Sequence, residues 1–148
     1  MFENCSHSST APGTGRIVLI LTVLLAAAVL LLTRAGPKAL DSTEGRCAYL
    51  ARCGLTAVPD SEEKREIELP ARFDAVLESY NRMQLARGYD LSPAAGKSCL
   101  CCSYDLAGYP GWDGRVIVTM YIYRSRVIGG DVHTADVNGF MLPLPKPS

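Results

Sequence analysis

The chain has 148 residues, which leaves room for one globular domain beside a membrane segment, and 15 Lys+Arg balance 15 Asp+Glu. Beyond residue 34 there are 13 basic and 14 acidic residues, so no basic excess is available to neutralise phosphates. These totals argue against a nucleic-acid partner and against a polybasic membrane clamp.

The beginning of the chain divides into a polar tail and an apolar segment. Residues 1–15 are rich in Ser, Thr, Gly and Pro without periodicity, which predicts a disordered tail. The seventeen residues Ile17–Thr33 carry no charge and lie between Arg16 and Arg34. As a helix they would reach about 25 Å, a little less than a bilayer core. We therefore predict a transmembrane helix over residues 16–34.

The apolar segment resembles an anchor more than a cleaved signal peptide, because the preceding residues hold one Arg and no A-x-A site follows closely. Its orientation is open from charge alone. Lys and Arg are more numerous on the C-terminal side, which favours a cytoplasmic domain, whereas long domains after a single N-terminal span translocate largely regardless of charge. We predict an uncleaved signal-anchor in the cell membrane, with the C-terminal domain extracytoplasmic.

The remainder divides into a linker over residues 35–42, one domain over residues 43–142 and a Pro-rich tail over residues 143–148. Hydrophobic periodicity predicts the element order helix, strand, helix and then three or four strands. We expect an α+β fold with a mainly antiparallel sheet of 4–5 strands and two helices on one face.

Capping residues and periodicity place the two helices. The first is predicted over Thr43–Arg52, with Ser42 or Thr43 as N-cap and Gly54 as the stop. The second is predicted over Ala71–Arg87, ending at Gly88. Its apolar stripe, predicted to face a sheet, contains Phe73, Val76, Leu77, Tyr80 and Met83.

Alternation and turn residues place the strands. The predicted strands are Glu66–Leu69, Ser98–Leu106, Val116–Tyr123, Arg126–Val132 and a last edge strand over Val137–Leu142. Arg124-Ser125 is the two-residue connection of the predicted hairpin.

Two stretches of the domain carry a resemblance to a known family. IELPARFDAVLESYNRMQLARGYDLSPAAGK and VIVTMYIYRSRVIGGDVHTADVNGFM contain the motifs YN, GYDL, VIGGDV and NGFM. In these motifs the chain, from about Cys47 to Leu142, resembles the bacterial family filed as domain of unknown function 4830. The resemblance implies an anchored or exported bacterial domain and brings no assigned activity. Arg124-Ser125 departs from the family's Asn-Gly-like turn, since neither residue favours the positive φ of a type I′ turn.

Five cysteines lie in the predicted domain: Cys47, Cys53, Cys99, Cys101 and Cys102. Cys99 and Cys101 share one face of a strand while Cys102 points away, and no second C-x₂-C pair accompanies Cys99 and Cys102, which argues against a zinc site. Burial as small hydrophobic side chains, or a disulfide or redox site, both remain open. The natural bridge would join the first helix to the strand containing Cys99–Cys102.

Asp131 and His133 are two residues apart on a strand and therefore share a face. No G-x-S-x-G motif supplies a nucleophile for a triad, so a surface pair is the stronger interpretation. We predict no catalytic residues, no metal and no cofactor.

Aromatic residues gather in or beside the predicted sheet, namely Tyr104, Tyr109, Trp112, Tyr121 and Tyr123. Amphipathic rings suit a recognition surface for a protein or a cell-wall glycan, although packing under the loop Ala107–Gly114 also explains them. We expect a non-enzymatic binding or accessory module held at the membrane. The alternative is a thiol-dependent redox or envelope-stress sensor that uses Cys99–Cys102.

Overall fold

The structure of the protein is a computed structural model that describes residues 37–148. The predicted tail over residues 1–15, the predicted membrane helix over residues 16–34 and the start of the predicted linker lie outside the described residues. Between residues 37 and 148, no helix combines the length and apolar character that a membrane span requires.

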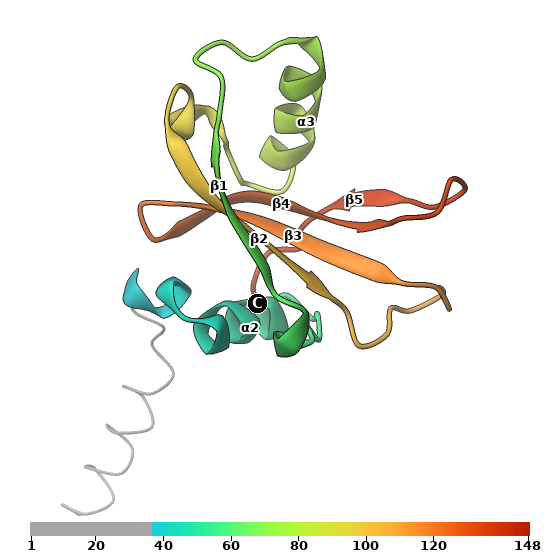
Figure 1. Cartoon of the computed structure of the whole chain (residues 1–148). Helices are drawn as coiled ribbons and strands as arrows, with labels where there is room; N and C mark the ends of the chain where they lie inside the picture. Colours follow the sequence, from blue (N-terminus) through green and yellow to red (C-terminus); the bar gives the residue numbers. More distant parts are fainter. Residues whose placement is uncertain (1–36) are drawn as a thin grey trace, which may run out of the picture. The chain divides into compact units, whose positions relative to one another are not determined.

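Five antiparallel strands form one sheet, and their order in space is their order in the chain (Figure 1). The strands are β1 (Glu63–Glu68), β2 (Ser98–Asp105), β3 (Val116–Tyr123), β4 (Arg126–Thr134) and β5 (Met141–Pro143). The predicted α+β class and antiparallel sheet are therefore confirmed. The last strand is shorter than predicted, because the amide of Gly139 donates to the carbonyl of Asp136 in a turn before it.

Two α-helices and three short 3₁₀ segments complete the described residues. Helix α2 (Thr43–Arg52) has the predicted bounds, and the Ser42 side chain accepts from the amide of Gly45. Helix α3 (Ala75–Leu85) is shorter than predicted, because the Asp74 side chain caps it by accepting from the amide of Leu77. The 3₁₀ segments are η1 (Pro37–Asp41), η2 (Pro59–Ser61) and η3 (Ser92–Ala94).

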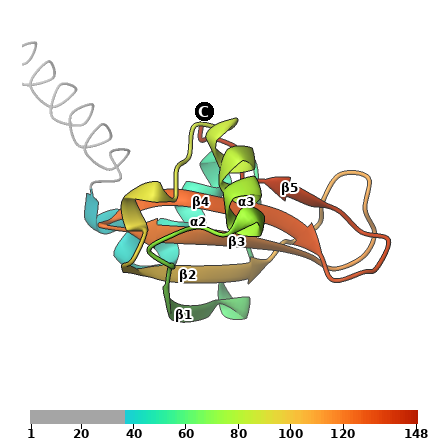
Figure 2. The same cartoon turned by 90° about the horizontal axis from the view of Figure 1, so that it is seen from above.

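The two helices cover opposite faces of the sheet, as Figures 1 and 2 both show. Leu50 of α2 packs with Cys102 and Val118 in one hydrophobic cluster. Leu77 of α3 packs with Cys99 and Tyr121 in another. The prediction that both helices lie on one face is wrong. Apolar side chains of β2 and β3 point to both faces of the sheet, so each face must be covered from water.

Helix α3 contacts the sheet through most of the predicted stripe, because Leu77 and Tyr80 pack against the cluster that contains Cys99. Val76 is 78% exposed, whereas Asn81 and Gln84 are buried. Gln84 Oε1 accepts from the amide of Gly130 at 3.0 Å, and Asn81 Oδ1 accepts from the amide of Leu91 at 2.8 Å. These two side chains satisfy buried backbone donors, so the buried face of α3 includes two amides that the predicted stripe omits, and Val76 lies outside that face.

The hairpin between β3 and β4 closes through a strained two-residue turn. Arg124 and Ser125 have φ of +50° and +56°, which is the left-handed geometry of a type I′ turn. The hairpin therefore has a tight two-residue turn even without an Asn-Gly sequence, and the left-handed conformation of these two residues costs conformational energy.

The predicted Pro-rich tail is part of the domain. Leu144 is fully buried, and its amide donates to the carbonyl of Gly130 at 2.9 Å. At the end of the chain, the amide of Ser148 donates to the carbonyl of Arg52 at 3.1 Å. The last six residues thus connect β4 with the end of α2.

Candidate functional site

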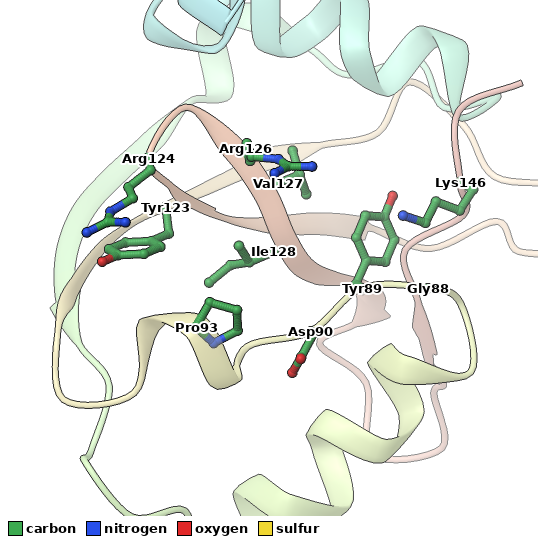
Figure 3. A pocket seen from close by; sticks show the side chains of 10 residues that line it. All are labelled: Gly88, Tyr89, Asp90, Pro93, Tyr123, Arg124, Arg126, Val127, Ile128 and Lys146. Carbon is green, nitrogen blue, oxygen red and sulfur yellow. The ribbon is translucent and has the colours of Figure 1, made fainter.

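A cavity of about 430 Å³ opens between the segment that follows α3 and the turn between β3 and β4 (Figure 3). We call it the basic pocket. Its lining residues are Gly88, Tyr89, Asp90, Pro93, Tyr123, Arg124, Arg126, Val127, Ile128 and Lys146. They come from three segments that are far apart in the sequence and meet only in the fold.

Backbone features hold the three segments in place. Gly88, with φ of +74°, turns the chain after α3, and the amide of Tyr89 then donates to the carbonyl of Gln84 at 3.0 Å. The left-handed turn at Arg124 reverses the hairpin at the other side of the pocket. Burial of Leu144 fixes the tail and thereby places Lys146.

Three cationic side chains line the basic pocket: Arg124, Arg126 and Lys146. Within residues 37–148, none of them forms a salt bridge. The one acidic residue of the lining is Asp90, and Figure 3 shows its carboxylate directed away from the cations. The pocket therefore presents net positive charge, although the domain as a whole is close to neutral.

The Asp90 carboxylate is engaged with its own loop. It accepts from the amide of Ser92 at 2.9 Å and from Asn81 Nδ2 at 3.1 Å. Burial by itself raises the pKa of Asp90, but these hydrogen bonds outweigh it and lower the pKa below the ordinary value. Asp90 thus stays ionised and is committed to the loop between α3 and β2.

Two of the cations lie over tyrosine rings. Lys146 Nζ is 3.9 Å from the ring centroid of Tyr89, and the guanidinium of Arg124 is 5.2 Å from that of Tyr123. Figure 3 shows these two pairs at opposite ends of the pocket. Because cation–π contacts favour these rotamers, the two charges are partly positioned before any ligand arrives.

The floor between the two cation–tyrosine pairs is apolar. Ile128 is buried in the cluster on the α3 side, and Pro93 is an exposed apolar residue of the lining. Figure 3 shows Ile128 and Pro93 between Tyr123 and Tyr89. The pocket thus offers positive charge at its ends and apolar surface at its centre.

The predicted aromatic surface is not brought together. Tyr104 is buried on the α2 side of the sheet, and Tyr109 and Trp112 pack against Phe140 with ring centroids 5.2 and 5.6 Å away. Tyr121 lies on the opposite face, against the edge of Tyr80. Tyr123 is the member of the group that lines the basic pocket.

The predicted cysteine group is distributed over both faces of the sheet. Cys99 packs on the α3 side and Cys102 on the α2 side. All five described cysteines, Cys47, Cys53, Cys99, Cys101 and Cys102, are free thiols, and Cys47 is the one that is not fully buried. Burial raises the pKa of each thiol, to about 11 for Cys53 and Cys102. Residues 37–148 contain no group of acidic, Cys or His side chains placed to hold a metal.

Asp131 and His133 share a face and contact each other, with 2.6 Å between His133 Nδ1 and Asp131 Oδ1. The Tyr80 hydroxyl donates to the other carboxylate oxygen at 2.6 Å. Burial and the Asp131 charge both raise the pKa of Tyr80, so this phenol stays neutral and donates. Within residues 37–148, Asp131 is the one side chain hydrogen-bonded to His133, and Asp131 joins α3 to the sheet through Tyr80.

Sequence reasoning does not find the basic pocket, because its cations belong to a hairpin turn and to the tail, where they form no motif. The pattern that could have revealed it is the pair Arg124 and Arg126 beside Tyr123 at a strand end. Lys146 gives no such indication, because only the fold brings the tail to the hairpin.

Comparison with protein-family models, with curated proteins and with solved structures finds no match to this chain. The resemblance to domain of unknown function 4830 therefore stays a prediction, and function is argued from the pocket.

Proposed function

We propose that this chain is a single-pass membrane protein whose α+β domain is a non-enzymatic binding module for an anionic ligand. The observation that carries the proposal is the set of three cations around the basic pocket, none of which forms a salt bridge within residues 37–148. Like charges held together repel, so a bound anion that neutralises them is favoured. The ligand would be a protein or a cell-wall component at the membrane surface.

The alternative of a thiol-dependent sensor has less support. A reactive cysteine needs an accessible thiolate with a lowered pKa, whereas burial raises the pKa of every described thiol. The cations of the pocket have no comparable obstacle, because Arg124, Arg126 and Lys146 are all exposed.

The binding proposal is tested with the full chain in nanodiscs of neutral phosphatidylcholine, so that lipid charge does not compete. A fluorescent hexaglutamate peptide serves as the anionic probe, and anisotropy reports binding. The wild type should bind the probe, and added salt should weaken binding. The double variant Arg124→Ala/Lys146→Ala should bind about tenfold more weakly, the loss of two exposed charge contacts.

The matched control is Arg72→Ala/Arg87→Ala, which removes the same charge at two exposed positions outside the basic pocket. It should bind the probe like the wild type. Equal weakening in both double variants would show that net charge, rather than the pocket, attracts the probe, and the proposal would be wrong.

We further propose that the predicted anchor over residues 16–34 holds the domain outside the cytoplasm. Val137 is fully exposed, so Val137→Cys supplies a reporter thiol in a chain with Cys5→Ser and Cys47→Ser. A membrane-impermeant maleimide should label this reporter on intact cells. Labelling that needs cell lysis would place the domain in the cytoplasm and overturn this orientation.

A further inference from the structure

We infer that the ligand of the basic pocket is an extended segment of a partner protein. In this segment an acidic, an apolar and a second acidic side chain occupy alternate positions, and small polar side chains lie between them. This inference rests on the proposed function, because it names the class of anion that the same pocket selects. It follows from the order of the groups along the pocket, which has a cation at one end, an apolar floor at its centre and a cation at the other end.

The two ends of the pocket can each bind a separate negative charge. Arg124 is held over Tyr123 at one end, and Lys146 is held over Tyr89 at the other. Because each cation rests on its own ring, a single small anion at one end would leave the other end without a partner. A ligand with two spaced carboxylates can contact both ends at once, and each contact raises the effective concentration of the other.

The floor calls for an apolar group between the two charges. Ile128 presents aliphatic surface there, and Figure 3 shows Pro93 beside it. Burying an aliphatic side chain on this floor removes apolar surface from water on both partners. A phosphate polymer or a polyglutamate chain has no such group and would leave the floor wet, so a mixed peptide fits better.

The spacing follows from strand geometry. In an extended segment, alternate side chains point to the same side, so the first, third and fifth residues can enter the pocket together. A peptide of sequence Glu-Ser-Leu-Ser-Glu therefore directs both acids and the leucine toward the pocket. In Glu-Leu-Ser-Ser-Glu, which has the same composition, the leucine points away.

Anisotropy with the full chain in phosphatidylcholine nanodiscs tests the inference with these labelled peptides. Glu-Ser-Leu-Ser-Glu should bind about fivefold more tightly than Glu-Ser-Ser-Ser-Glu, as expected for a partly buried leucine. Glu-Leu-Ser-Ser-Glu should bind no better than the peptide without leucine. The variant Pro93→Ser, which replaces an exposed apolar residue of the floor by a polar one, should reduce the advantage of leucine, while Arg124→Ala/Lys146→Ala should weaken all three peptides.

The outcomes separate this inference from the proposed function. If the three peptides bind equally and the double variant weakens them all, the anion site stands and the peptide pattern is wrong. If inorganic tripolyphosphate binds more tightly than Glu-Ser-Leu-Ser-Glu, the ligand is a phosphate polymer and the inference is overturned. If the double variant changes nothing, the proposed function fails and the inference fails with it.

Discussion

The Arg46 guanidinium is 1% exposed and depends on the Glu62 carboxylate, 2.5 Å away, for its charge partner. Glu62 also accepts hydrogen bonds from the hydroxyls of Tyr104 and Thr43. Burial alone raises the pKa of Glu62, but these bonds together lower it to about 2. Because the folded pKa lies below the ordinary value of 4.5, the stability that Glu62 contributes is present above pH 4.5 and is lost as pH falls toward 2.

We predict that Glu62→Gln lowers the free energy of unfolding by about 3 kcal/mol at pH 7, because it leaves the buried Arg46 without a counter-charge. The loss should shrink between pH 4.5 and 2, where wild-type Glu62 itself becomes protonated. Urea unfolding across this range measures both effects. Glu63→Gln, at an exposed neighbouring position, should stay within about 0.5 kcal/mol of the wild type. A Glu62→Gln chain with the full wild-type pH dependence would contradict the account.

Because the turn is strained, replacing serine by glycine should change the free energy of unfolding in opposite directions at Ser125 and at Ser98. Ser125 has φ of +56°, so Ser125→Gly relieves left-handed strain and should stabilise the chain by about 0.5–1 kcal/mol. Ser98 begins β2, where Ser98→Gly should destabilise by about 0.5–1 kcal/mol. Urea unfolding of the two variants measures both changes, and a lower free energy of unfolding in Ser125→Gly would argue against the type I′ turn. Ligand binding should not change in Ser125→Gly, because Arg124 is retained.

At the level of elements, α3 is held to the sheet by the hydroxyl of Tyr80 on the buried Asp131. Tyr80→Phe removes a hydrogen bond to a charged group and should lower the free energy of unfolding by about 1.5–3 kcal/mol. Amide exchange should rise more in α3 than in α2, which lies on the other face of the sheet and can change only through global unfolding. Tyr123→Phe is the control, because its hydroxyl has no hydrogen bond within residues 37–148 and should cost little. An equal rise of exchange in both helices would contradict the assignment of this contact.

The same elements show how far sequence could go. The sequence is sufficient to place α2 and β3 to the residue, because Ser42 and Gly54 mark the helix ends and VIVTMYIY is a continuous β-forming run. For α3 the apolar stripe correctly places Leu77 and Tyr80 against the sheet but wrongly includes Val76, which is exposed. It also omits Gln84, which is buried through a bond to the backbone of Gly130. Side-chain to backbone bonds across the fold leave no periodic pattern, so neither the burial of Gln84 nor the helix's place on the far face was predictable.

The candidate site also depends on contacts between residues that are far apart in the sequence. The aromatic residues cluster in the sequence, yet alternation along β2 and β3 places Tyr104 and Tyr121 on opposite faces. Tyr123 reaches the basic pocket because it precedes the turn at Arg124. Its partner Lys146 reaches the pocket because the tail packs back on the domain, which composition alone does not reveal.

For the whole molecule, this tail couples stability to the site. Leu144 is fully buried whereas Leu142 is 46% exposed, so the two leucines form a matched pair two residues apart. Leu144→Ala should lower the free energy of unfolding by about 3 kcal/mol, through lost burial and a residual cavity, and Leu142→Ala by less than about 1 kcal/mol. Under conditions where both variants stay folded, Leu144→Ala should also weaken hexaglutamate binding, because Lys146 loses the anchor that places it over Tyr89. Equal small losses in stability for the two variants, with unchanged binding, would mean that the tail neither closes the core nor positions the pocket.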